Sequence, residues 1–112
     1  MTGIILSDEF AKEFSKVQQK ASKGNGEAEY VVRMIDRGIA RLYSNHEAGQ
    51  QIKRKLWPKV YIDRHDINNL WRLHLDSSWR MIYTLRGPDV EIVALILEVM
   101  DHKSYEKRFG YR

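Results

Sequence analysis

Cysteine is absent from the 112-residue sequence, which excludes a disulfide framework and a thiolate-bound metal ion. The four histidines are isolated from one another and no His-Glu-x-x-His pattern occurs, so we expect no bound metal. A Walker phosphate loop, a dinucleotide fingerprint and a Gly-x-Ser-x-Gly motif are also missing. These absences argue against nucleotide-dependent and acyl-transfer enzymes, and we expect no cofactor.

Long apolar runs are lacking as well. No stretch approaches the roughly 20 apolar residues of a membrane-spanning helix, and residues 1–6 lack the basic and long apolar regions of a signal peptide. The absence of cysteine is compatible with a reducing compartment. We therefore expect an intracellular, cytoplasmic protein with no membrane partner.

The length and the charge distribution indicate the number of domains and the kind of partner. A chain of 112 residues predicts one domain, spanning residues 1–112. Residues 1–49 hold 7 Lys/Arg and 7 Asp/Glu, whereas residues 50–112 hold 12 Lys/Arg, 8 Asp/Glu and 8 of the 12 aromatic residues. A basic and aromatic half is typical of a polyanion binder. A solvated basic surface without a partner is the alternative.

Two amphipathic helices are predicted in the first half. Residues 4–6 predict a short strand, after which Ser7 offers an N-cap. The first helix ends at residues 24–26 and carries one apolar stripe: Phe10, Phe14, Val17 and Ala21. The second starts near Glu27 with its own stripe: Ala28, Val31, Ile35, Ile39 and Leu42. Together they predict an antiparallel helical hairpin. Each predicted helix also has a basic face, formed by Lys12, Lys16 and Lys20 on the first and by Arg33, Arg37 and Arg41 on the second. These faces could contact phosphates, but the simpler interpretation is that they are exposed to water.

The second half has β character. Residues 60–62 predict a short strand, residues 63–69 a loop, and residues 70–75 and 79–85 a strand pair joined by a tight turn. The apolar run at residues 90–99 predicts a central strand buried on both faces. The fold class is therefore α+β: an N-terminal strand and a helical hairpin packed on a three- to five-stranded, mainly antiparallel sheet. We expect the helices to cover one face and the other face to carry function.

Cationic groups recur along the predicted strand pair. Side chains alternate across a strand, so Arg72 and His74 share the face opposite the core residues. Antiparallel pairing brings Arg80 close to both. Such groups repel one another unless an anion lies between them, which favours a phosphate-bearing substrate. Exposure to water, or ion pairs with nearby carboxylates, is the alternative.

The segment after the central strand is basic and aromatic. His102 follows the strand directly, where an imidazole is held by the sheet and can transfer protons near neutral pH. Aromatic faces there are suited to stacking on unpaired bases while cations hold phosphates. The aromatic residues are Tyr105, Phe109 and Tyr111. Tyr105 and Phe109 have i,i+4 spacing, so a short helix that seals the core is the other interpretation.

In these residues the chain resembles the RelE/ParE toxin superfamily. The resemblance rests on Leu70-Trp71-Arg72-Leu73-His74-Leu75, then Ser78-Trp79-Arg80-Met81-Ile82-Tyr83, then an apolar strand followed by His102-Lys103-Ser104-Tyr105. It implies a small α+β toxin that is neutralised by a cognate acidic antitoxin. RelE-like members are metal-independent endoribonucleases, or mRNA interferases, which cleave mRNA on the ribosome and block translation.

The resemblance also implies roles for individual residues. The catalytic set is Arg72, His74, Arg80, His102 and Tyr105, with Tyr111 or even Phe109 as the alternative to Tyr105. The RNA-binding set is Lys53, Arg54, Lys55, Lys103, Lys107, Arg108 and Tyr111. ParE-like members share the fold but bind DNA gyrase and are not nucleases. A ParE-like toxin, or an inactive RNA- or antitoxin-binding relative, is therefore the alternative function.

Overall fold

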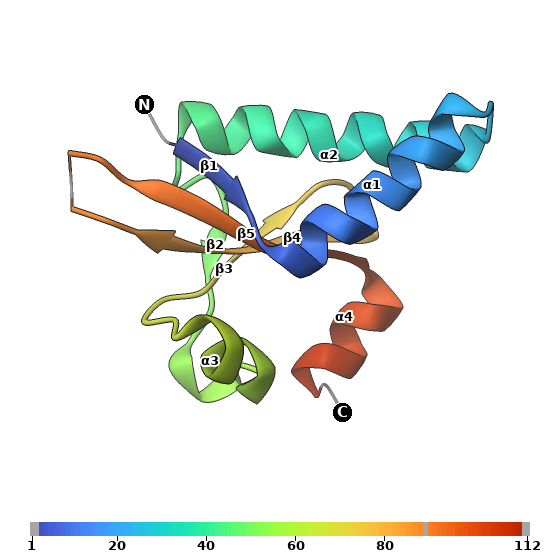
Figure 1. The fold of residues 1–112 in the computed structure, drawn as a ribbon. Coiled ribbons are helices and arrows are strands. Elements are labelled where there is room, and N and C mark those ends of the chain that lie inside the picture. Colours follow the sequence, from blue (N-terminus) through green and yellow to red (C-terminus); the bar gives the residue numbers. More distant parts are fainter. Residues whose placement is uncertain (1–2, 89, 111–112) are drawn as a thin grey trace.

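The computed structural model describes residues 3–88 and 90–110 and consists of a five-stranded sheet with helices on both faces (Figure 1). The elements along the chain are β1 (Gly3–Leu6), α1 (Asp8–Ser22), α2 (Gly26–Ser44), β2 (Gln50–Gln51), the 3-10 helix η1 (Arg54–Leu56), α3 (Lys59–His65), β3 (Trp71–His74), β4 (Trp79–Arg86), β5 (Val93–Asp101) and α4 (His102–Phe109). The strand order is β1-β5-β4-β3-β2, with β1 parallel to β5 and the other pairs antiparallel. The predicted α+β class is confirmed.

The helical hairpin forms as its sequence predicts. Ser7 caps α1 by accepting a hydrogen bond from the backbone N–H of Phe10 (3.1 Å), and Asn25 caps α2 at Ala28 (2.9 Å). The Ser7 hydroxyl also donates to the carbonyl of Leu97 (2.9 Å), which joins the start of α1 to β5. One face of the sheet and the hairpin bury a first core of aromatic and aliphatic side chains: Phe10, Phe14, Val31, Met34, Ile35, Leu42, Leu73, Met81, Tyr83, Ala94 and Ile96.

The opposite face of the sheet is covered too, contrary to the expectation that it stays open. The helices α3 and α4 pack there (Figure 1) and bury a second core: Ile52, Tyr61, Ile67, Leu70, Ile82, Leu97, Met100, Tyr105 and Phe109. The expectation overlooked that residues 52–70 and 105–109 bring enough apolar side chains to cover a second face. The central strand β5 is consequently buried on both faces, as predicted.

One predicted strand and the start of another are wrong. Residues 60–62 belong to α3, which starts after Pro58 and ends at Asp66 in a left-handed conformation (φ 49°). Their β-branched and aromatic composition indicated a strand, but the segment is helical, and within α3 only Tyr61 is buried. The central strand starts at Val93 instead of residue 90, because the turn extends further and Val90 is 88% exposed.

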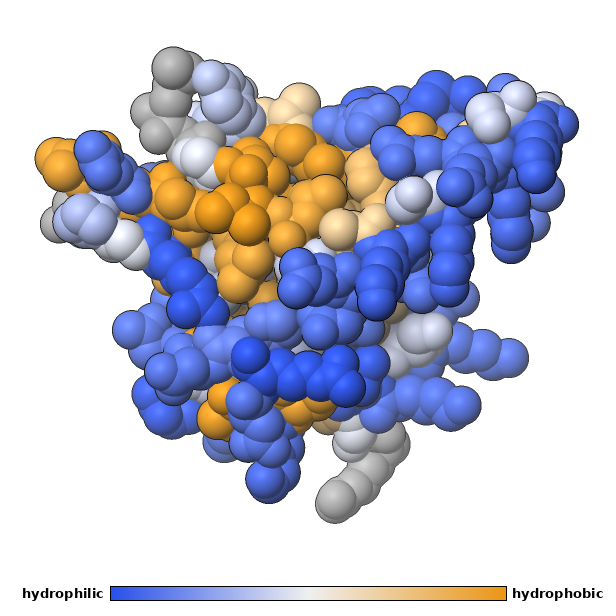
Figure 2. Space-filling model, in the orientation of Figure 1, coloured by the Kyte–Doolittle hydropathy of each residue, from blue (hydrophilic) through white to orange (hydrophobic). Residues whose placement is uncertain are grey.

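The edge strand β1 leaves apolar surface in view. It lies at one edge of the sheet, and its residue Ile5 is 54% exposed. Figure 2 shows apolar surface around β1 and beneath α2, next to the hydrophilic surface of α1. Within residues 3–88 and 90–110, no helix combines the length and the apolar character that crossing a bilayer requires.

Tyr83 and Gly49 set the position of β3. The buried Tyr83 hydroxyl donates to the carbonyl of His46 (2.9 Å) and accepts from the N–H of Gly49 (3.1 Å). Burial raises the pKa of Tyr83 to about 12, so the phenol stays protonated. The backbone at Gly49 lies so close to β3 that a Cβ there would be 2.4 Å from the Arg72 carbonyl oxygen.

Gly49→Ala is expected to lower the free energy of unfolding by about 1–3 kcal/mol, because overpacking forces β3 and Tyr83 to shift. Urea denaturation followed by circular dichroism measures this change. Gly26→Ala is the matched control, since no atom lies within 4 Å of a Cβ at that position. Equal midpoints for the two variants would contradict the close approach.

Candidate functional site on the β3–β4 face

The predicted cationic cluster is brought together by the strand register. His74 pairs directly with Arg80, and Arg72 pairs with Ile82, on the antiparallel β3 and β4. Directly opposed residues share one face, and Arg72 lies two residues from His74. The three side chains therefore project from the face that α4 covers, while Leu73 and Met81 point into the first core. The pairing that the sequence predicted is confirmed.

Tyr105 of α4 lies against the two arginines. The Arg72 guanidinium donates to the Tyr105 hydroxyl oxygen (2.6 Å). The Cζ atoms of Arg80 and Arg72 lie 5.0 and 5.8 Å from the centre of its ring, where the π-face attracts a cation. Tyr105 is only 2% exposed and stacks on Phe109, with 4.3 Å between ring centres. Tyr105 thus both seals the second core and holds the arginines.

His74 is an exposed imidazole whose pKa lies below the usual 6.5. Partial desolvation is the largest cause, and the positive charges of Arg80 and then Arg72 add to it. The neutral imidazole is therefore the favoured form near pH 7, and a neutral imidazole is able to accept a proton. An anion placed among the three groups would reverse the electrostatic part of this shift.

Backbone and amide groups orient the arginines. The Gln50 side-chain oxygen of β2 lies 3.4 Å from both Nε and Nη2 of Arg72, and the Ser78 carbonyl accepts from Arg80 (2.9 Å). The turn before β4 is held by Asp76, which accepts from the N–H groups of Ser78 (2.8 Å) and Trp79 (2.7 Å). Sequence analysis missed Gln50, because a strand of two residues shows no alternation.

Predicted residues on α4 make ion pairs of their own or are exposed. His102 is exposed at the start of α4 and pairs with Glu106 (3.2 Å), and Lys103 is exposed beside it. Arg108 pairs with Glu98 (3.0 Å), which also accepts from Tyr61 (2.5 Å). These contacts tie α4 and α3 to β5.

The other predicted RNA-binding residues are dispersed. Lys53, Arg54 and Lys55 are exposed around η1, with the Arg54 guanidinium 4.8 Å from the ring centre of Trp57. Lys107 lines a groove between α1 and α4. Tyr111 lies outside the described residues, so its alternative role stays a prediction. In the part of the chain that the structure describes, no three His, Asp or Glu side chains gather in a way that would hold a metal ion.

Comparisons with known proteins agree with this architecture at the level of the fold. No protein-family model matches the sequence, and no curated protein matches it. Among solved structures, the chain is similar to the YoeB/ParE toxin from Agrobacterium tumefaciens, with a TM-score of 0.58 and 13% sequence identity. The match covers 90% of this chain and 99% of that chain. The chain therefore shares the fold of this YoeB/ParE toxin.

The pKa of His74, measured by NMR titration, is expected to lie below 6.5 and to rise in Arg80→Ala, because the variant removes one repelling charge. Arg33→Ala, on the exposed face of α2, is the control and should leave that pKa unchanged. Since the folded-state pKa is the lower one, the stabilising contribution of His74 declines as the pH falls from 6.5 through that value. An unchanged His74 pKa in Arg80→Ala would show that the charge of Arg80 does not influence His74.

Proposed function

We propose that this protein is the toxin of a type II toxin–antitoxin pair, acting in the cytoplasm as a metal-independent, ribosome-dependent mRNA endonuclease that inhibits translation. One observation carries the proposal: Arg72, His74 and Arg80 share one face of the sheet, and Tyr105 contacts both arginines there. The RelE/ParE-like fold supports the toxin assignment.

The chemistry that fits these groups is attack of a ribose 2′-hydroxyl on the adjacent phosphate. His74, neutral at pH 7, accepts the proton of the 2′-hydroxyl as general base. Arg72 and Arg80 stabilise the negative charge that develops on the phosphorane oxygens. The departing 5′-oxygen needs a proton, and His102 is the residue assigned to donate it, once substrate or ribosome brings it within reach.

Tyr105 acts through the arginines in this scheme. At 2% exposure it does not reach the RNA while α4 is docked, so we assign it the role of a positioning residue for Arg72. The exposed cations that would contact RNA outside the reacting phosphate are Lys53, Arg54, Lys55, Lys103 and Lys107. Arg108 and Tyr111 are the remaining candidates. An acidic antitoxin is the partner that would neutralise this surface.

Arg80→Ala is expected to lower the rate of mRNA cleavage on programmed ribosomes by about 10²-fold or more, because it removes a cation from the transition state. Its thermal midpoint should fall only slightly, because the substitution removes the contact of the half-buried Arg80 with the Tyr105 ring and leaves the apolar side chains of the second core in place. Arg33→Ala is the charge-matched control and should cleave normally. Full cleavage by folded Arg80→Ala would remove this arginine from the mechanism.

A non-nuclease toxin that binds DNA gyrase is the second candidate, favoured by the ion pair of His102 with Glu106, which engages the imidazole assigned as proton donor. Expression of the protein without an antitoxin is expected to stop protein synthesis while DNA supercoiling stays normal. Pulse labelling and plasmid topology measured in the same cells distinguish the two functions. Lost supercoiling with translation intact would select the gyrase-binding candidate.

A further inference from the structure

Residues 50–62 carry an excess of positive charge. They contain no acid and four cations: Lys53, Arg54, Lys55 and Lys59. Lys59 pairs with Asp63, the first acid after the segment (2.9 Å). The other three cations are exposed and form no ion pair with any residue that the structure describes. Uncompensated positive charge of this kind favours an anionic ligand.

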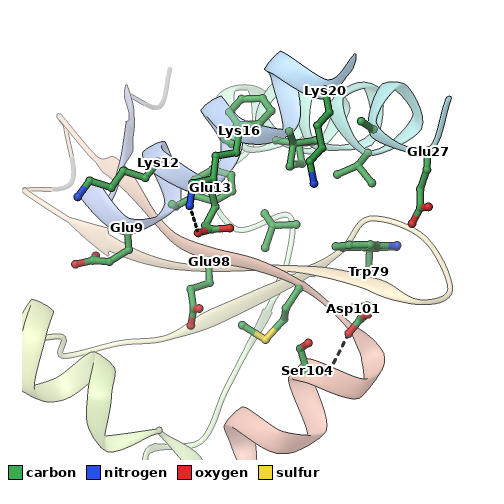
Figure 3. Close-up of a pocket in the computed structure, with 18 of the residues that line it drawn as sticks. Glu9, Lys12, Glu13, Lys16, Lys20, Glu27, Trp79, Glu98, Asp101 and Ser104 are labelled. Atoms are coloured by element: carbon green, nitrogen blue, oxygen red, sulfur yellow. Dashed lines mark hydrogen bonds and ion pairs between the residues drawn. The ribbon is translucent and has the colours of Figure 1, made fainter. Parts of the chain in front are cut away.

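The groove between α1 and α4 does not share this excess. Figure 3 shows acidic side chains among its lysines. Five basic residues line it, and so do five acidic ones: Glu9, Glu13, Glu27, Glu98 and Asp101. Because these charges balance, a polyanion is attracted less to the groove than to residues 53–55.

A cation and an aromatic ring are stacked within the basic segment. The Cζ atom of Arg54 lies 4.8 Å from the ring centre of Trp57. The Trp57 backbone N–H donates to the Arg54 carbonyl (3.0 Å), and the indole Nε1 donates to the carbonyl of Ile52 (2.8 Å). Ile52 is buried in the second core, and Trp57 packs against that core. The indole is thus held by the fold, whereas the side chain of Arg54 is exposed.

Strand β2 connects this pair to the cationic cluster. Gln50 pairs with Arg72 in the sheet, and its side-chain oxygen lies 3.4 Å from two guanidinium nitrogens of that arginine. Lys53 follows three residues later, and three residues span at most about 11 Å. With about 5 Å between paired strands, the total is close to five nucleotides of a stacked strand at roughly 3.4 Å each. One short RNA strand is therefore able to reach both places.

We propose that the Arg54–Trp57 pair is a stacking site for one unpaired base of single-stranded RNA, with Lys53 and Lys55 binding the phosphates beside that base. Bases stack on guanidinium planes as well as on aromatic rings, and contact with the indole orders the Arg54 side chain before RNA arrives. Every base has a π-face, so this site selects an unpaired strand over a duplex and does not read its sequence. The inference rests on the proposed function for the choice of RNA as ligand.

Arg54→Lys tests the stack, because lysine keeps the charge and lacks the planar group. The probe is a labelled single-stranded 2′-O-methyl RNA of about ten nucleotides, which lacks the attacking hydroxyl and cannot be cleaved. Fluorescence anisotropy with the full chain should show binding about tenfold weaker for Arg54→Lys than for the wild type. Arg33→Lys makes the same exchange on the exposed face of α2 and should bind normally. Wild-type affinity in Arg54→Lys would overturn the proposal.

Removal of single bases from the probe locates the stack. With the base absent at one position, wild type and Arg54→Lys should bind equally, whereas removal elsewhere should preserve their difference. The salt dependence separates the stack from the phosphate contacts. Lys53→Ala/Lys55→Ala should make the slope of log K against log salt concentration shallower by about 1.4, and Arg54→Lys should leave that slope unchanged. A difference that persists at every position, or equal binding of duplex RNA, would contradict the stacking site.

Two further outcomes are informative. Polyglutamate that displaces the RNA at an equal concentration of charges would identify an acidic polypeptide as ligand and reject the RNA stack. Because the probe cannot be cleaved, the binding result does not depend on nuclease activity. Binding that depends on Arg54, in a protein that leaves mRNA on programmed ribosomes intact, would reject the nuclease assignment alone. Normal cleavage with equal binding by wild type and Arg54→Lys would reject the stack alone.

Discussion

Burial of β5 on both faces is the constraint on which the rest of the molecule depends. Ile96 belongs to the core beneath the helical hairpin, and the adjacent Leu97 belongs to the core beneath α3 and α4. The register of β4 against β5 shifts at this point, between Ile82 and Tyr83. Consecutive residues of one strand therefore anchor two separate cores, and the two edges of that strand determine where β1 and β4 lie.

The second core also explains how a cluster of like charges is tolerated. Arg72, His74 and Arg80 would repel one another on a bare sheet. Tyr105, carried by α4, gives one arginine a hydrogen-bond acceptor and both arginines an aromatic face. The Glu98 carboxylate in turn holds α4 through Arg108 and α3 through Tyr61, and burial raises the pKa of that tyrosine. The short helix α4 therefore both seals the second core and stabilises the arginines of the cluster.

Helices and strands with a regular apolar periodicity over several turns or residues could be predicted from the sequence. The helical stripes of α1 and α2 and the two-residue alternation of β3 and β4 identified the hairpin and the face shared by Arg72, His74 and Arg80. The i,i+4 spacing of Tyr105 and Phe109 indicated a helix that seals the core, and the structure has that helix. These patterns depend on neighbouring residues, so the secondary structure that they predict agrees with the tertiary structure.

Shorter or non-local features could not be predicted in the same way. The residues of α3 have β-branched and aromatic composition, which indicated a strand, whereas the segment forms a helix with Tyr61 buried in the second core. Gln50 reaches Arg72 from a strand too short to alternate.

The pairing of β1 with β5 has a kinetic consequence. The Ser7–Leu97 hydrogen bond joins residues 90 positions apart, so forming this contact carries the entropy cost of closing a loop that spans most of the chain. The helical hairpin is built from neighbouring segments and is able to form much earlier, with Phe10 and Phe14 still uncovered. Chains that pause at this stage display an apolar helix face to one another, and chaperone capture or aggregation competes with completion of the sheet.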